Sequence, residues 1–478
     1  MAFNPIYTEK VLNPSYKNWK DLFFSHSVYL HRAHLIMLLK TGIITHETAR
    51  KLKYAVDSVA QKKNFPKDIP PGSEDLYFVF EKQMEEVIGQ DTAGFLHTAR
   101  SRNDMDTTIF RMFVRTRLMD FLSCCINLLS VIQDKVYKQG DTPIVLYTHG
   151  QPANPSTLGH YLSAFALDLC EDINELFSAL RIVDRSSMGA CAITTTGFNI
   201  DRKMVSDLLG FESPVSNSYQ AIVTSHWLTY PADAVRKILN DVTRFSADLS
   251  HKASCEVGML LFPDELVQIS SIMPQKRNPV IIEHIRIQAG MAMGIMSMIN
   301  ELFHNAAYQD INEVADAPVK EFENSLELAE SVVALMSQTI KNIDISRQRV
   351  SEIALSSGTT TTELADELVR LYGISFRQAH SITAGFVRSG YDKDALRNIF
   401  QEKTDRSLKL SDKEIDEILS IERFISVRKV SGGPSEEGME VVLKELEKYI
   451  SAFSFSLDKK EKDILSAQQN LKTEYDII

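Results

Sequence analysis

The sequence predicts an all-α fold, in which several long helices pack side by side as a bundle. Across residues 157–183, apolar side chains recur at spacings of three and four, at Leu162, Phe165, Leu169, Ile173, Leu176 and Leu180. An apolar stripe this broad needs several neighbouring helices to cover it, which makes an oligomer plausible. Strand signals are short and scattered, and no repeat of fixed period is present.

Two other long helices are predicted at residues 107–137 and 279–303, and the charged tail at residues 457–478 predicts a terminal helix. The second of these helices carries Met291, Met293, Met296 and Met298. Because methionine is unbranched and adapts to irregular gaps, we expect core packing rather than a ligand pocket. Residues rich in Gly, Pro, Ser, Thr or Asn predict loops at 64–76, 137–156, 185–199, 355–363 and 430–438.

The composition is that of a soluble globular protein. Of the 478 residues, 44% are hydrophobic and 24% are charged, so a large core is available. The net charge of −11 argues against a nucleic-acid coat, and any anion site must therefore be locally basic. Five cysteines without metal-ligand spacing predict reduced thiols in a cytoplasmic protein. We find no export signal and no apolar run of about 18 residues that would predict a membrane span.

Three loops hold unusual polar clusters. In "HTARSRNDMD" (97–106), two arginines and Asn103 precede a long helix, whose free N–H groups and dipole favour an anion. Asp104 and Asp106 fit equally well as caps of that helix. In "YTHGQPANP" (147–155), His149 is a candidate proton carrier, although a lone loop histidine is more often structural.

The third loop, "ISSIMPQKRNP" (269–279), combines a serine pair, a lysine and an amide, which suits a carboxylate. An ordinary surface loop with solvated charges is the alternative. The sequence contains no G-x-S-x-G elbow, Walker loop, H-E-x-x-H motif or dinucleotide fingerprint. We therefore expect acid–base chemistry without a metal or another cofactor.

In this order, "HTARSRND", "YTHGQPANP" and "SSIMPQKRNP" resemble the signature regions of the fumarase and aspartase superfamily, and most closely those of the argininosuccinate lyase family. Matches also occur at "AHLIMLLKTGIIT", "GFNIDRK", "ELADELVRLYGISFRQAH" and "SGGPS", so the resemblance covers nearly the whole chain. It implies a carbon–nitrogen lyase that eliminates fumarate from an N-substituted aspartate. Argininosuccinate, which would yield arginine, is the expected substrate.

The resemblance also implies roles for individual residues. A proton beside a carboxylate is weakly acidic, since its loss creates a doubly charged aci-carboxylate that needs cations and fixed donors. Ser270 matches the general base, with Ser271 as the alternative if the register differs by one, and Lys276 supplies positive potential. His149 matches the acid or proton relay, and Glu283 matches its carboxylate partner. The expected substrate-binding residues are Ser101, Arg102, Asn103, Thr148, Asn278, Tyr308 and Asn312.

The resemblance implies three helical domains, which we expect at residues 1–105, 106–360 and 361–478. The central bundle is expected in the second domain. Family members are homotetramers whose active sites are shared between subunits, so we expect the same assembly, a small dicarboxylate substrate and no nucleic-acid or membrane partner. Because several residues differ from the family pattern, the sequence does not determine the identity of the amine half of the substrate. Ile269 replaces a usual glycine, Gln220 and Ser225 stand where the family usually has an Asp and an Arg, Gln309 replaces a common basic residue, and His31 replaces a serine. Several of these positions are expected to contact the arginine end of argininosuccinate or the far carboxylates.

Two other hypotheses about the function remain. A related lyase would act on a different N-substituted aspartate, and a structural relative would keep the fold without the activity. The joint presence of Ser270, Lys276, Asn278, His149 and Glu283 argues against the structural relative. An adenylosuccinate-type lyase is disfavoured because "HTARSRND" resembles the argininosuccinate branch.

Overall fold

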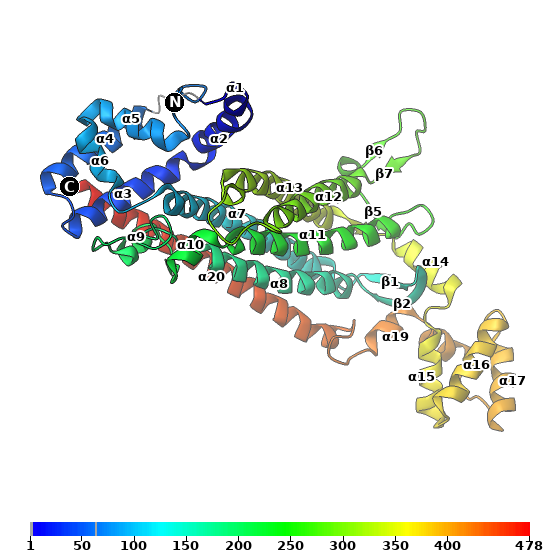
Figure 1. Cartoon of the computed structure of the whole chain (residues 1–478). Coiled ribbons are helices and arrows are strands. Elements are labelled where there is room, and N and C mark those ends of the chain that lie inside the picture. The colour runs from blue at the N-terminus through cyan, green and yellow to red at the C-terminus, as the bar shows by residue number, and fades with distance from the viewer. Residues whose placement is uncertain (1–2, 63–64) are drawn as a thin grey trace.

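The computed structural model describes residues 3–62 and 65–478, and it confirms an all-α fold of elongated shape (Figure 1). Five long helices form the central bundle: α7 (Arg102–Gln139), α8 (Leu158–Val183), α11 (His226–Lys252), α12 (Val280–Phe303) and α13 (Asp316–Asn342). The three long helices predicted from periodicity are α7, α8 and α12. None of the helices in the described part of the chain is long and apolar enough to cross a bilayer.

The helices that precede the bundle are α1 (Pro5–Tyr7), η1 (Thr8–Leu12), α2 (Asn13–Asn18), η2 (Trp19–Phe23), α3 (Phe24–Lys40), α4 (His46–Lys62), α5 (Leu76–Ile88), α6 (Gln90–Gly94) and η3 (Phe95–His97). The first residue of the predicted loop 64–76 lies outside the described residues. After the bundle come α14 (Arg347–Ser357), α15 (Thr361–Tyr372), α16 (Phe376–Arg388), α17 (Lys393–Thr404), α18 (Asp412–Ile418), α19 (Ile421–Ser426) and α20 (Glu436–Asp476).

Strands occur only as short pairs in the described residues. The hairpin of β1 (Pro143–Thr148) and β2 (Gln151–Thr157) links α7 to α8, and β6 (Gln268–Ile269) pairs antiparallel with β7 (Arg277–Asn278) before α12. The remaining pairs join β3 (Arg185–Ser186) to β4 (Ser213–Pro214) and β5 (Leu260–Leu261) to β8 (Asp344–Ile345). The segments between them hold α9 (Arg202–Leu208), α10 (Ser218–Val223), η4 (Asp264–Leu266) and η5 (Asn312–Val314).

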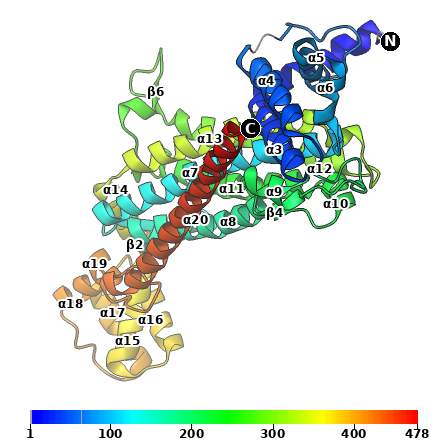
Figure 2. The ribbon, with the colours of Figure 1, turned by 90° about the vertical axis from the view of Figure 1, so that its left-hand side faces the viewer.

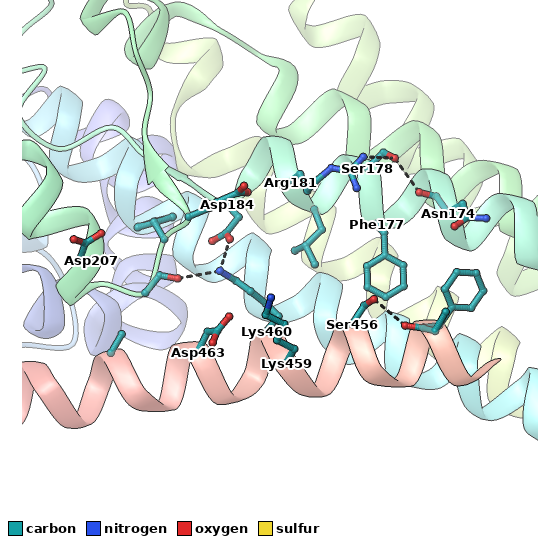
Figure 3. Close-up of a pocket in the computed structure, with 17 residues that line it drawn as sticks. Asn174, Phe177, Ser178, Arg181, Asp184, Asp207, Ser456, Lys459, Lys460 and Asp463 are labelled. Carbon is teal, nitrogen blue, oxygen red and sulfur yellow. Dashed lines mark hydrogen bonds and ion pairs between the residues drawn. The ribbon is translucent and has the colours of Figure 1, made fainter. Parts of the chain in front are cut away.

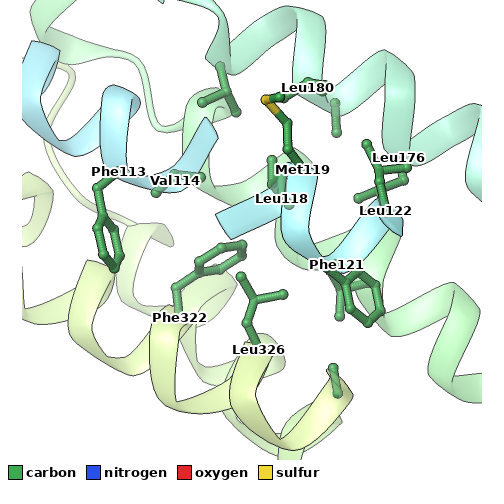
Figure 4. Packing of buried hydrophobic residues seen from close by; sticks show 14 of the residues in the cluster. Phe113, Val114, Leu118, Met119, Phe121, Leu122, Leu176, Leu180, Phe322 and Leu326 are labelled. Carbon is green, nitrogen blue, oxygen red and sulfur yellow. The ribbon is translucent and has the colours of Figure 1, made fainter. Parts of the chain in front are cut away.

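Buried apolar side chains fill the bundle. Phe121 of α7 lies toward Phe322 and Leu326 of α13, whereas Leu122 lies beside Leu176 of α8, and all of these side chains are fully buried (Figure 4). Helix α20 runs along α7 and α8 and adds Leu446, Phe453 and Leu457 to the same core (Figure 2). It includes the predicted terminal helix but begins much earlier, where Ser435 caps its first turn. Residues 364–418 have a separate core of their own.

The methionine prediction for α12 is only partly right. Met296 is fully buried, but Met291 is 55% exposed and Met298 is 40% exposed. Ile287 and Leu302 are also exposed on this helix, at 55% and 41%. A Cβ atom added to Gly290 or Gly294 would meet no atom within 4 Å. In a single chain, therefore, α12 presents an apolar face that no other described segment covers.

The bundle separates its two ends by a long distance. Helix α7 has 38 residues, which at 1.5 Å per residue span about 57 Å. The first end of the bundle holds the start of α7 and the loop after α12. The second end holds the β1–β2 hairpin and the segment from α11 to α12 (Figure 1).

Candidate active site

The predicted site residues lie in three separate places in one chain. Ser101, Arg102 and Asn103 are at the first end, where they lie near the loop that holds Tyr308 and Asn312. Thr148 and His149 form the tip of the β1–β2 hairpin at the second end. The β6–β7 hairpin, which carries Ser270, Lys276 and Asn278, projects from that end in another direction, with Glu283 at the start of α12 (Figure 1).

The first loop is held by a capping box at the start of α7. The Ser101 hydroxyl accepts a hydrogen bond from Asn103 N, and the Asp104 carboxylate accepts one of 2.9 Å from Ser101 N. Asp104 is fully buried and also accepts hydrogen bonds from the N–H groups of Gly189 and Cys191. The capping explanation therefore holds for Asp104, whose carboxylate fixes the loop in place.

Arg102 and Asn103 already contact carboxylates within the chain. The Arg102 guanidinium forms ion pairs of 2.7 Å with Asp75 and 2.9 Å with Glu74. Burial opposes its charge, but these two carboxylates outweigh burial and raise the pKa of Arg102. Asn103 Nδ2 donates a 2.8 Å hydrogen bond to Asp310. These carboxylates were missed from the sequence, because an acidic residue directly before a helix, as in "SEDLYF", predicts an N-cap, a role that Asp75 also has in α5.

The positions that depart from the family pattern lie near this end. Gln220 and Gln309 are exposed, and the neighbouring Tyr219 donates a 2.6 Å hydrogen bond to the carbonyl of Tyr308. His31 is different, because its side chain is buried and its Nδ1 accepts a hydrogen bond of 2.9 Å from Arg100. Burial and the charge of Arg100 lower the pKa of His31 well below its usual range. His31 thus orients Arg100 and does not face solvent.

His149 occupies the tip of the β1–β2 hairpin, where its ring is exposed. Its φ of 53° and that of Gly150, 73°, lie in the left-handed region, which turns the chain tightly back into β2. A non-glycine residue in this region is strained, and such strain tends to persist where the surroundings hold it. Within one chain, no contact joins His149 to Glu283 in the described residues.

The β6–β7 hairpin surrounds one serine with backbone donors. Ser270 Oγ accepts hydrogen bonds of 3.0 Å from Met273 N and 3.3 Å from Ile272 N. Ser270 N donates to the carbonyl of Lys276 and so closes the loop. Amide N–H groups that point at a hydroxyl oxygen stabilise its ionised form. Ser271, which is exposed, has no such donors among the hydrogen bonds of the described residues.

The two cations of this hairpin differ in their surroundings. Arg277 forms an ion pair with Asp264 and donates a hydrogen bond to the carbonyl of Phe262. Lys276 is exposed and forms no ion pair with any residue in 3–62 or 65–478. The charge of Lys276 is therefore the one available to a ligand. Ile269, which replaces the usual glycine, pairs with Arg277 in the strand ladder and is 75% exposed.

A groove of about 840 Å³ lies elsewhere, between α8, the α9–β4 segment and α20 (Figure 3). At its floor the buried Asp184 forms ion pairs with Arg115 and with Lys460 of α20. These contacts attach α20 to the end of α8. The predicted site residues do not line this groove, so it is not the site that the sequence indicates.

Comparison with known proteins finds related lyases over nearly the whole chain. A family model described as "Lyase" matches residues 27–294, and one described as "Argininosuccinate lyase C-terminal" matches residues 358–426. Argininosuccinate lyase 2 of Agrobacterium fabrum is 38% identical over 91% of this chain and 88% of that protein. Argininosuccinate lyase 1 of Shouchella clausii is 30% identical over 97% of this chain and 95% of that protein.

Solved structures show the same architecture. EDDS lyase in complex with formate has a TM-score of 0.86 and 25% identity, covering 99% of this chain and 96% of its own. A class II fumarase from Schistosoma mansoni has a TM-score of 0.66 at 17% identity, covering 84% and 90%. The fumarase likeness concerns the fold alone. The chain therefore belongs to the argininosuccinate lyase family of the fumarase/aspartase superfamily and is a carbon–nitrogen lyase.

Proposed function

We propose that the protein eliminates fumarate from an N-substituted aspartate, with argininosuccinate as the substrate and arginine as the second product. Ser270 removes the proton beside one carboxylate, and Lys276 stabilises the resulting aci-carboxylate together with Asn278. His149 protonates the departing nitrogen or relays the proton, with Glu283 as its partner. The observation that carries this proposal is the pair of backbone N–H groups directed at Ser270 Oγ, since a serine can act as a base only where its ionised form is stabilised.

The remaining predicted residues bind the substrate: Ser101, Arg102, Asn103, Thr148, Tyr308 and Asn312. For Arg102 this role requires a rearrangement, because its guanidinium is engaged by Glu74 and Asp75. Its planar group can bind a carboxylate through two parallel hydrogen bonds once it is free.

The active site is proposed to form between subunits of a homotetramer. The first loop and His149 lie at opposite ends of α7, about 57 Å apart by helix length, which is far beyond the reach of one small molecule. A second chain that runs antiparallel brings its second end to the first end of its neighbour. The uncovered apolar face of α12 offers the surface for such an association. We further propose a cytoplasmic location, as the sequence predicts.

A second candidate function is elimination from a different N-substituted aspartate. It is favoured by Gln220, Ser225 and Gln309, which replace charged residues of the family pattern, since several of the departing positions are expected to contact the arginine end or the far carboxylates. The similarity to EDDS lyase, a relative named for another substrate, points the same way.

Ultraviolet absorbance of fumarate tests both candidates. Release from argininosuccinate by the wild-type protein, and its loss in Ser270→Ala, is the expected result. Release only from other N-substituted aspartates would replace the first candidate with the second. No release from any of them would refute both and would favour a structural protein.

A further inference from the structure

Lys252, the last residue of α11, buries its ammonium group beneath the β1–β2 hairpin. Its side chain is 2% exposed, and Nζ donates a 2.6 Å hydrogen bond to Asp248 Oδ2 one turn earlier. The Tyr161 hydroxyl of α8 donates a 2.6 Å hydrogen bond to the same oxygen. An ammonium group that loses its hydration is costly, so the surrounding contacts have to compensate. They join α8, α11 and the hairpin at one point.

Two aromatic rings complete the surroundings of this ammonium. Nζ lies 4.8 Å from the ring centroid of Tyr161 and 5.5 Å from that of Tyr147. Tyr147 belongs to β1, directly before Thr148 and His149. Its ring also packs edge-on against His251, with centroids 5.0 Å apart. A cation over an aromatic face is attracted by the ring quadrupole, most strongly where water is excluded.

The hairpin tip needs such support because its own geometry is irregular. The strand ladder shifts register between Leu146 and Tyr147, and His149 has a positive φ. The carbonyl of Lys252 also accepts a 2.9 Å hydrogen bond from Met259 N, at the start of the segment that leads to the β6–β7 hairpin. Lys252 therefore contacts three parts of the chain: the last turn of α11, β1 at Tyr147, and the start of the segment that leads to the β6–β7 hairpin.

We propose that Lys252 is a positioning residue for the β1–β2 hairpin: its ammonium, held by Asp248, fixes the Tyr147 ring and thereby the placement of His149. The proposal rests on the proposed function in assigning proton transfer to His149. Lys252 itself does not touch the substrate, because it is buried. It acts through the hairpin.

The first test measures fumarate release by the full-length assembled enzyme. Lys252→Met removes the charge and keeps the volume, and it is expected to lower kcat by about 10²-fold, the cost of a displacement near 1 Å. Lys252→Arg, which retains the charge, should recover most of the rate. Lys135→Met is the matched control, since Lys135 is also buried but donates to the carbonyl of Ile343 at the end of α13. It should stay close to the native rate.

A double-mutant cycle separates positioning from a general loss of structure. If Lys252 acts through His149, Lys252→Met should cause at most about a twofold further loss in a His149→Asn background. Losses that multiply would overturn the proposal. Should Lys252→Met fail to assemble, Tyr147→Leu tests the same link from the other side, with the same expectation in the His149→Asn background.

Hydrogen exchange tests the positioning without reference to activity. Amides of residues 143–157 should exchange faster in Lys252→Met than in the wild type, whereas Lys135→Met should leave them unchanged. Native exchange in the hairpin of Lys252→Met would refute the proposal even if the kcat of this variant falls. Conversely, an inactive wild-type protein would refute the proposed function, while faster hairpin exchange in Lys252→Met would still support the positioning role.

Discussion

The Asn103 amide donates a 2.8 Å hydrogen bond to the carboxylate of Asp310, which joins the start of α7 to the loop after α12 across 207 residues of sequence. Burial raises the pKa of Asp310, although Arg102 and Asn103 both favour its charged form. One part of the candidate site is thus assembled within a single chain. The Asn103 amide, expected to bind a substrate carboxylate, binds the carboxylate of Asp310 in this chain, and the Ser270 hydroxyl, expected to act as the base, lies at the other end of the bundle.

Replacing Ser270 by alanine should lower kcat by roughly 10²–10⁴-fold, the range that a general base contributes. The assembly should remain intact, because Ser270 lies in a projecting hairpin outside the core. Ser271→Ala is the matched control, since backbone N–H groups are directed at Ser270 Oγ and not at its neighbour. Steady-state kinetics of fumarate release measure both variants. A larger loss of kcat in Ser271→Ala than in Ser270→Ala would identify Ser271 as the base.

Asp104 should make stability depend on pH between about 4 and 6. Burial raises the pKa of its carboxyl to about 6 from 3.8, against the opposing hydrogen bonds from Ser101, Cys191 and Gly189. In this window the folded protein holds a proton that the unfolded chain has released. The contribution of Asp104 to stability is therefore greatest at low pH and is lost as pH rises through 6, by roughly 3 kcal/mol in total.

The comparison with Asp104→Asn isolates this group, because other titrating residues are common to both proteins. The free energy of unfolding of the wild type minus that of the variant should fall as pH rises from 4 to 6 and level off above 7. Chemical denaturation at each pH measures the difference. A difference that stays flat across this range would show that Asp104 keeps an ordinary pKa.

The features predicted correctly from the sequence are those that depend on local residue patterns. Spacings of three and four gave α7, α8 and α12, and the polar loops marked the segments that leave the bundle. The start of α7 was missed by five residues, since the periodic apolar pattern begins after the capping box of Ser101 and Asp104. The predicted domain boundaries at residues 105 and 360 stay a prediction, and α20 packs along α7 and α8 although it follows the second boundary.

Contacts between distant segments could not be read from the pattern. The ion pairs of Arg102 with Glu74 and Asp75 depend on how the loop before α5 meets the start of α7. Burial of Lys252 was equally hidden, because a lysine at the end of a helix normally favours the C-terminal dipole in solvent. The exposure of Met291 was missed for a different reason. Periodicity shows which face of a helix is apolar, but it does not show whether that face is covered by the same chain or by a second one.

Two variants that are inactive alone should restore each other when mixed. If each site takes its first loop from one chain and the β6–β7 hairpin from another, then co-refolded Asn103→Ala and Ser270→Ala chains form some sites with both segments intact. Random mixing should recover roughly a quarter of the native rate. Mixing Asn103→Ala with Arg102→Ala is the control, because both change the same loop and no site can be complete. Equal rates in the two mixtures would contradict a shared site.

The uncovered face of α12 should govern assembly. Met291→Lys places an ammonium group in the proposed interface, where an unpaired charge costs several kcal/mol, and it should shift the protein toward smaller species. Leu355→Lys is the control, because Leu355 is 73% exposed on α14, away from α12. Sedimentation velocity measures the species, and fumarate release should fall with the dissociated fraction, since a separated chain keeps its first loop and its Ser270 hairpin apart. A monomeric Met291→Lys protein with native activity would show that one chain contains the whole site. That result would contradict the proposal of a site shared between subunits.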